Sequence, residues 1–286
     1  MKIGMLTGLW YVAGEATLVE SLRRAAALGF RYVDLHGVFH AGPAHLSLPA
    51  RQQVKTELET LGLSARNYVL HSPHNPTSAG PAELEASFEY LREGIDLCLF
   101  WGIHQLMLNP GQWVYGLSRQ QAWENAVRFI QRVCDYAASL GVFIALEAEP
   151  YVWFLVVDLP STVQMLADVD RENFTVLVDL GHLGLSRERP EDLAQLGDRI
   201  IHAHFSDHEK FCHTNQVIGT GFTPTADYLE WLRRTDIDRQ VRRFGYDELV
   251  ISFELGAPGD QIADPDDQVR RSLDFVRRIA PFMSLV

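Results

Sequence analysis

The sequence predicts an α/β protein in which residues 1–286 form a single (β/α)8 barrel. Strand and helix patterns alternate eight times along the chain, as expected for parallel strands joined by helical crossovers. The length of 286 residues suits such a barrel, which typically takes about 250. No Gly-x-Gly-x-x-Gly motif follows the first strand, which argues against an open dinucleotide-binding sheet.

The first half of the chain supplies four of the expected strands. They are short apolar segments at residues 1–8, 31–36, 63–71 and 104–109. Amphipathic patterns predict helices at residues 17–28, 49–61, 81–101 and 118–140. Gly29, Gly62 and Gly102 end the first three helices, and Ser118 is a suitable N-cap for the fourth.

The second half contains four apolar runs, each of which carries a potential metal ligand toward its end. The runs are GVFIALEAEP (141–150), FTVLVDLGH (174–182), IIHAHFSDH (200–208) and LVISFELG (249–256). Each has the length and composition of a buried strand. Helices are expected at residues 161–168, 190–197, 225–234 and 264–279, with Pro265 in the first turn of the last.

Composition limits the classes of partner. The formal charge of −12 disfavours nucleic acid, because DNA-binding proteins normally present a basic face. The first residues, MKIGMLTGLW, lack the apolar core of a signal peptide, and no stretch approaches the roughly 18 apolar residues of a membrane span. Cys98, Cys134 and Cys212 are too widely spaced for a disulfide framework. We therefore expect a cytoplasmic protein that binds neither nucleic acid nor a membrane.

Candidate metal ligands should meet at one end of the barrel, because the carboxyl ends of its strands share a common mouth. These ligands are Glu147, Asp179, His204 and Glu254. Buried carboxylates need a partner to offset their lost solvation, and a shared cation would supply one. Three carboxylates and one imidazole suit Mn²⁺ best, with Mg²⁺, Co²⁺ or Zn²⁺ as alternatives. Any one of these residues could instead be salt-bridged or solvated at a strand end.

Other acids and histidines lie close in sequence to the candidate ligands, so the ligand of each strand has to be chosen among them. His202 and His204 lie on the same face of a strand, because side chains alternate with a period of two. We choose His204 as the ligand because it is nearer the carboxyl end. His182 lies in VDLGH, where it could bind a substrate hydroxyl or cap a helix. Glu147 and Glu149 present the same choice on the fifth strand, and we expect Glu147, not Glu149, to be the metal ligand.

These motifs resemble those of the xylose isomerase-like barrel superfamily of sugar isomerases and epimerases. AAALGFRYVDLHG is similar to the superfamily's opening segment, GVFIALEAEP to its fifth strand and VLVDLGH to its Asp-x-x-His segment. HAHFSD is similar to its His-x-His-x-x-Asp segment and ISFELG to its final glutamate. The resemblance covers nearly the whole chain. It implies a TIM barrel with one divalent metal held by Glu147, Asp179, His204 and Glu254.

The ketose 3-epimerase branch indicates the chemistry that this resemblance implies. In that branch the metal binds a sugar carbonyl and hydroxyl, which acidifies the adjacent C–H and stabilises an enediolate. By resemblance, Glu147 and Glu254 exchange the proton while His182 steadies an oxygen. The chain departs from ketohexose 3-epimerases at Trp153, where they carry a glutamate, and at Lys210, where they carry an arginine. A free ketohexose is therefore a doubtful substrate.

Further substrate-binding candidates lie at the ends of strands two to four and after strand seven. A tryptophan could stack on a sugar ring, and the polar groups could bind hydroxyls. Any of them could also lie at the rim without contacting a ligand. The set comprises His36, His71, Asn109, Trp113, His208 and Lys210.

Three other functions remain open. Inosose or dehydroshikimate dehydratases use the same metal-assisted chemistry and then expel a hydroxyl group. The apurinic-site endonuclease branch shares several of the ligands, but its fourth-strand histidine is Asn109 here and its Asp-x-His motif is His213-Thr214-Asn215. The third alternative is a barrel that binds a sugar without catalysis.

The oligomeric state cannot be read from the sequence. Trp10, Tyr11 and Phe39 are expected in exposed loops. There they could form a homo-oligomer contact or close over a neighbour's pocket.

Overall fold

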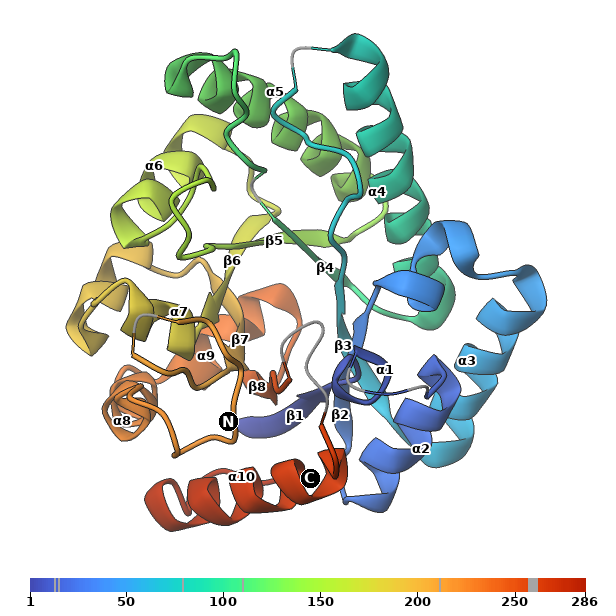
Figure 1. The fold of residues 1–286 in the computed structure, drawn as a ribbon, viewed down its shortest axis with the longest axis vertical. Coiled ribbons are helices and arrows are strands. Elements are labelled where there is room, and N and C mark those ends of the chain that lie inside the picture. The colour runs from blue at the N-terminus through green and yellow to red at the C-terminus, as the bar shows by residue number, and fades with distance from the viewer. Residues whose placement is uncertain (13, 15, 79, 110, 211, 257–261) are drawn as a thin grey trace.

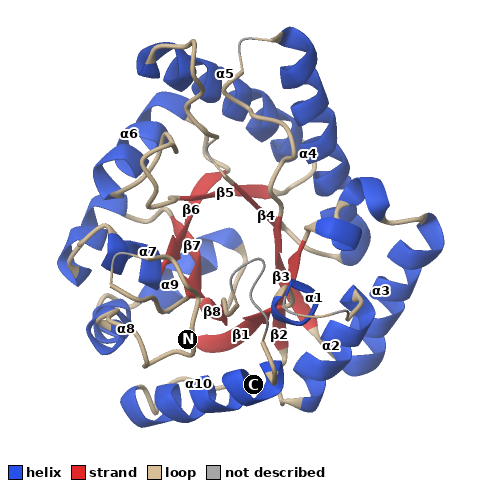
Figure 2. Ribbon diagram, viewed as in Figure 1, coloured by secondary structure: helices blue, strands red, loops and turns tan. Residues whose placement is uncertain are grey.

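The protein is a closed barrel of eight parallel strands surrounded by helices (Figure 1). The computed structural model describes residues 1–12, 14, 16–78, 80–109, 111–210, 212–256 and 262–286. Each strand pairs with the next along the chain, and β8 pairs with β1 to close the ring seen in Figure 2. This confirms the predicted fold class. The strands are β1 (Lys2–Leu6), β2 (Tyr32–His36), β3 (Ser64–Val69), β4 (Gln105–Leu108), β5 (Phe143–Glu147), β6 (Phe174–Asp179), β7 (Ile200–Phe205) and β8 (Val250–Phe253).

Helices connect successive strands and cover the outside of the barrel (Figure 2). The α-helices are α1 (Leu9–Val12), α2 (Leu18–Ala27), α3 (Leu48–Leu61), α4 (Pro81–Trp101), α5 (Arg119–Ala138), α6 (Leu159–Val169), α7 (Leu180–Leu185), α8 (Thr225–Arg234), α9 (Ile237–Val241) and α10 (Pro265–Ile279). The 3₁₀ helices are η1 (Phe39–Ala41), η2 (Pro43–His45), η3 (Pro190–Leu196) and η4 (Arg242–Phe244).

Local signals in the sequence set several helix boundaries as predicted. Ser118 caps α5, since its Oγ accepts a hydrogen bond from the Gln121 N–H at 3.1 Å. Gly62 and Gly102 follow α3 and α4 in the left-handed conformation, with φ of 64° and 74°. A side chain would be strained there, so glycine ends both helices. The bounds of α4 and α8 match the prediction.

The short elements differ from the prediction. The hydrophobic pattern does not reveal α1, α9, η1, η2 or η4, because about one turn of helix is too short to show a period. The helix expected at residues 190–197 is the 3₁₀ helix η3. The run at residues 174–182 divides, because β6 ends at Asp179 and α7 begins at Leu180.

The expectation that Trp10 and Tyr11 are exposed is wrong. Their exposed fractions are 2% and 6%. The Trp10 indole N–H donates to Asp266 Oδ1 at 2.7 Å, which ties α1 to the first turn of α10. The Tyr11 hydroxyl donates to the His36 carbonyl. Of the three proposed contact residues, Phe39 alone is exposed, at 61%.

The helices and the cysteines can be compared with what the composition predicted. Among the described residues, no helix has both the length and the hydropathy needed to cross a bilayer. All three cysteines are free, with Cys98 and Cys134 buried and Cys212 exposed.

Polar side chains fill the barrel interior next to its carboxyl-terminal mouth. Asp34 of β2, His202 of β7 and Ser252 of β8 are 0–2% exposed. Asp34 Oδ2 lies 2.7 Å from His202 Nε2, and Ser252 Oγ lies 3.5 Å from the same nitrogen. A Cβ at Gly4 of β1 would lie 2.4 Å from Ser252 Oγ, so glycine leaves room for the serine. This polar layer supports the residues at the mouth.

Burial in the core predicts how two helix leucines differ in importance. Leu22 of α2 is 0% exposed, whereas Leu99 of α4 is 38% exposed. Leu22→Ala should lower the free energy of unfolding by about 2–5 kcal/mol, because it leaves a cavity. Leu99→Ala should change it by about 0.5 kcal/mol or less. Denaturant unfolding measures both, and equal effects would contradict the packing described here.

Candidate active site

Four potential metal ligands converge at the carboxyl ends of the last four strands. They are Glu147, Asp179, His204 and Glu254. One ligand atom from each lies within 4.8 Å of those of the others. Glu254 comes directly after β8, and its N–H donates to the Phe205 carbonyl of the neighbouring strand at 3.1 Å. The barrel thus brings together residues that are more than 100 positions apart in the sequence.

His204 lies between three carboxylates. Its Nδ1 is 2.8 Å from Glu254 Oε2 and 3.2 Å from Glu147 Oε1, and its Nε2 is 3.3 Å from Asp34 Oδ2. Burial alone would lower the pKa of His204. The charge of Glu147 and the hydrogen bonds to Asp34, Glu147 and Glu254 outweigh burial and hold that pKa well above its usual range. Without a metal ion, a proton on His204 therefore supplies positive charge at the centre of the cluster.

Asp179 offers an oxygen with no protein partner. Its Oδ1 accepts hydrogen bonds from the Ser206 hydroxyl at 2.5 Å and from the His182 backbone N–H at 2.8 Å. Its Oδ2 is buried and has no hydrogen-bond partner among the described residues. Burying such an oxygen is costly unless a cation or donor approaches it. The three carboxylates and one imidazole are a donor set that fits a divalent cation.

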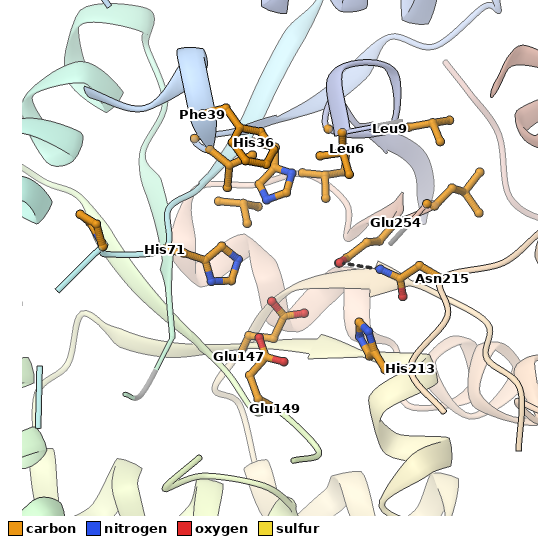
Figure 3. Close-up of a pocket in the computed structure, with 18 of the residues that line it drawn as sticks. Leu6, Leu9, His36, Phe39, His71, Glu147, Glu149, His213, Asn215 and Glu254 are labelled. Atoms are coloured by element: carbon orange, nitrogen blue, oxygen red, sulfur yellow. Dashed lines mark hydrogen bonds between the residues drawn. The ribbon is translucent and has the colours of Figure 1, made fainter. Parts of the chain in front are cut away.

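The two glutamates of the cluster lie in different electrostatic surroundings. Burial raises the pKa of Glu147. For Glu254, burial acts in the same direction, but the hydrogen bond and charge of His204, together with the charge of His182, hold its pKa well below the usual range. Glu254 Oε1 also accepts a hydrogen bond from Asn215 Nδ2 at 3.0 Å (Figure 3). Glu254 is thus the more readily ionised of the two.

His182 and His213 form a hydrogen-bonded pair beside the cluster. His182 Nδ1 donates to the Ala148 carbonyl at 2.9 Å, and its Nε2 lies 2.7 Å from His213 Nε2. Despite burial, which opposes protonation, Asp179 and Glu149 raise the pKa of His182 to about 9. Burial and the neighbouring His182 lower the pKa of His213 to about 4. His182 therefore carries the shared proton and His213 accepts it.

A cavity of about 700 Å³ opens beside the cluster (Figure 3). Glu147 and Glu254 contribute to its lining, together with the predicted residues His36, His71 and His182. The rings of His36 and His71 pack edge to face, with centroids 5.9 Å apart. Burial lowers the pKa of both, to about 3 for His36, so both are neutral near pH 7.

Three predicted substrate-binding residues lie outside the lining of this cavity. Trp113 is 45% exposed, and its indole N–H donates to the Leu117 carbonyl. Lys210 is also exposed. Asn109 lines a smaller neighbouring pocket together with His71, and its Nδ2 donates to Glu149 Oε1 at 3.2 Å. Glu149 itself lines the cavity, and burial raises its pKa to about 7. Glu149 therefore lies in the cavity wall, although the sequence favoured a position without a role in the site.

The remaining histidines orient the ligands. His202 is hydrogen-bonded to Asp34 at 2.7 Å, while His204 lies in the cluster. His208 Nδ1 accepts backbone N–H bonds from Thr214 and Asn215, both at 3.2 Å, so its Nε2 carries the hydrogen. That Nε2–H donates to Ser206 Oγ at 2.9 Å, and Ser206 in turn donates to Asp179. Both ring nitrogens of His208 are thus already engaged.

Sequence reasoning missed several residues of this site. Asp34 had one available signal, since it is a carboxylate inside the apolar strand YVDLH. Ser206 gave no such signal, and His213 and Asn215 were noted only as the positions of the endonuclease branch's Asp-x-His motif. Ser206 follows β7, while His213 and Asn215 lie in a loop after it, and the folded chain brings all three to the mouth.

Together, the fold and the site define a TIM barrel with a carboxylate and imidazole cluster at the ends of its last four strands. A family model described as a xylose isomerase-like TIM barrel matches residues 22–279, and the chain belongs to that family. This confirms the resemblance inferred from the motifs.

Two relatives and one solved structure illustrate the family. The chain is 22% identical over 287 residues to L-ribulose 3-epimerase from Methylomonas sp. (strain DH-1), covering 95% of this chain and 94% of that protein. It is 26% identical over 180 residues to 3-dehydroshikimate dehydratase from Bacillus anthracis, covering 63% and 62%. The crystal structure of a D-tagatose 3-epimerase-like protein has a TM-score of 0.80 at 20% identity, covering 99% of this chain and 98% of that one.

The Asp34 carboxylate should sustain the protonation of His204. Asp34→Asn retains the side-chain shape but removes one of the hydrogen-bonded charges that raise the pKa of His204. We expect that pKa to fall in the metal-free protein, as measured by NMR titration of the imidazole signals. Asp274→Asn removes a charge from a side chain that is 65% exposed and serves as the control. An unchanged His204 pKa in Asp34→Asn would contradict the role of Asp34.

Proposed function

We propose that this protein is a divalent-metal-dependent sugar isomerase or epimerase that acts on a C–H bond next to a carbonyl. The observation that carries the proposal is the four-residue cluster beside the cavity. Glu147 and Glu254 belong both to the cluster and to the cavity lining. The groups that would hold the metal therefore also reach the space that a substrate would occupy.

The metal would be held by Glu147, Asp179, His204 and Glu254. The partnerless Oδ2 of Asp179 and the Nδ1 of His204, which faces two carboxylates, are suitable donor atoms. Oxygen-rich ligation favours Mn²⁺, while Mg²⁺, Co²⁺ and Zn²⁺ are also compatible. When bound, such an ion polarises a carbonyl and its neighbouring hydroxyl, which makes the adjacent C–H more acidic.

The proton transfers would fall to the two glutamates. In this proposal Glu254, whose pKa is lowered chiefly by His204 and which also accepts a hydrogen bond from Asn215, removes the proton from carbon, and Glu147 returns one. Glu147 is the last residue of β5, Glu254 directly follows β8, and the two enter the cavity from different sides (Figure 3). Inversion at carbon requires such an arrangement. His182, which lines the same cavity, would steady a substrate oxygen by exchanging its Nε2–H bond to His213 for one to the substrate.

The relatives support the reaction class more than any one substrate. L-ribulose 3-epimerase matches along nearly the whole chain. Trp153 stacks on Tyr151, with ring centroids 4.7 Å apart, and lies outside the lining of the cavity, as does Lys210. The two positions that depart from ketohexose 3-epimerases are thus away from the cavity surface. The substrate is better sought from the cavity itself.

Loss of the proposed base should abolish proton exchange at carbon. Glu254→Gln keeps the size of the side chain but removes the basic oxygen, so deuterium incorporation next to the carbonyl should slow by about 100- to 10,000-fold. NMR in D₂O, with the Mn²⁺-loaded protein and a panel of neutral keto sugars, measures the exchange. Glu172→Gln, at an exposed position, is the matched control. Exchange that persists in Glu254→Gln would reject Glu254 as the base, whereas the absence of exchange in the unaltered protein would favour a barrel that binds sugar without catalysis.

The dehydratase relative makes elimination the second candidate function. Elimination begins with the same removal of a proton but ends with loss of a hydroxyl group. Incubation with 3-dehydroshikimate or a keto-inositol distinguishes the two outcomes. An enone chromophore would assign the protein as a lyase, whereas carbon-bound deuterium without a chromophore supports the isomerase.

Metal binding should release a proton near neutral pH. His204 has a raised pKa in the metal-free protein, and its Nδ1 must lose a proton before it can act as a ligand. The affinity for Mn²⁺ should therefore rise with pH through the neutral range. Calorimetry in two buffers with different ionisation enthalpies measures both the affinity and the proton release. Asp179→Asn should weaken binding by at least about 10- to 100-fold. Asp274→Asn is again the control, and pH-independent binding would contradict this assignment.

A further inference from the structure

The cavity beside the cluster has two chemically different sides. Figure 3 shows Leu6, Leu9 and Phe39 on one side and Glu147 and Glu149 on the other. His36 lies beside Phe39, and the lining further includes the apolar residues Val12, Val38, Ala44 and Leu255. The polar side would hold the reacting carbons of the proposed sugar. A volume of about 700 Å³ is typical of cavities that enclose drug-sized ligands, so it leaves room for a second group beside a single sugar ring.

The charge of the cavity disfavours anionic substrates. Among the described residues that line it, none is lysine or arginine. The residues outside the described ranges contain neither residue type in their sequence: Ala13, Glu15, Ala79, Pro110, Phe211 and 257–261. Glu147, Glu149 and Glu254 face the same space as His182. The positive charge of His182 is already balanced by Asp179 and Glu149, so a phosphate or carboxylate group would lose its hydration there against an excess of negative charge.

Phe39 provides a second, independent observation. Its backbone has a φ of 51°, a conformation that is strained for a bulky side chain. Its ring is 61% exposed and lines the cavity at the mouth. Glycine would relieve the strain at this position, yet the chain has an aromatic residue there. An exposed ring at the entrance offers a surface on which an apolar or aromatic group can stack.

We propose that the substrate is an uncharged keto sugar or cyclitol that carries an apolar substituent, such as an aryl or alkyl aglycone. The substituent packs against Leu9 and Phe39, while the carbonyl and its neighbouring hydroxyl face the acidic cluster. The position of the reacting end rests on the proposed function. The preference for an uncharged, apolar-substituted molecule rests on the cavity lining alone.

Three model substrates test this preference directly. They are methyl and phenyl β-D-glucosides oxidised to the ketone at carbon 3, and the 6-phosphate of the methyl compound. With the Mn²⁺-loaded protein, kcat/KM for C–H exchange in D₂O should be more than about tenfold higher for the phenyl than for the methyl compound. The phosphate ester should be exchanged more slowly than either. Equal rates for phenyl and methyl, or faster exchange of the phosphate, would overturn the proposal.

Variants at Phe39 locate the preference in the apolar side of the cavity. Phe39→Ala should lower the phenyl-to-methyl ratio toward one, and Phe39→Leu should retain part of it. The ring is largely exposed, so neither change should lower the melting temperature appreciably. A ratio that stays high in Phe39→Ala would overturn the assignment of Phe39.

A binding measurement separates this inference from the proposed function. Phenyl β-D-glucoside and D-glucose lack the ketone, so calorimetry reports their binding without reaction. Preferential binding of the phenyl compound that is weakened by Phe39→Ala supports the substrate class, even if no keto sugar exchanges its hydrogen. Exchange of free ketoses without any preference for the phenyl compound would overturn the substrate class and leave the proposed function standing.

Discussion

The structure depends on holding three carboxylates, two buried and one partly buried, close together at the barrel mouth. Glu147, Asp179 and Glu254 offer oxygens within 4.8 Å of one another and of a nitrogen of His204. Like charges at such distances repel strongly where water is scarce, unless positive charge lies between them. In the metal-free protein, His204 supplies that charge as a proton. The same arrangement gives the site its fit to a divalent cation.

Residues behind the cluster fix its geometry. Asp34 contacts both His202 and His204 from the barrel interior, at 2.7 and 3.3 Å. On another side, His208 donates to Ser206, and Ser206 donates to an oxygen of Asp179. Such supporting hydrogen bonds set the orientation of a ligand before any ion or substrate arrives. They also explain why several polar groups lie buried in a barrel that is otherwise apolar.

The two halves of the chain contribute different parts of the site. The ligand cluster comes from β5 to β8, whereas Leu6, Leu9 and Phe39 come from the first two strand-to-helix connections and the strand that precedes them. The barrel places both sets around one cavity. The loops of the first half can therefore vary without disturbing the cluster. In this chain those loops make an apolar wall.

The sequence by itself predicted the barrel and the four residues that converge at its mouth, because hydrophobic period, helix caps and strand-end acids are local features. It placed Ser118, Gly62 and the bounds of α4 correctly for the same reason. Only the tertiary structure decided that Trp10 is buried against α10 and that Trp113 and Lys210 lie away from the cavity. The position of a loop depends on packing between segments that are distant in the sequence, and a local sequence pattern does not predict such contacts.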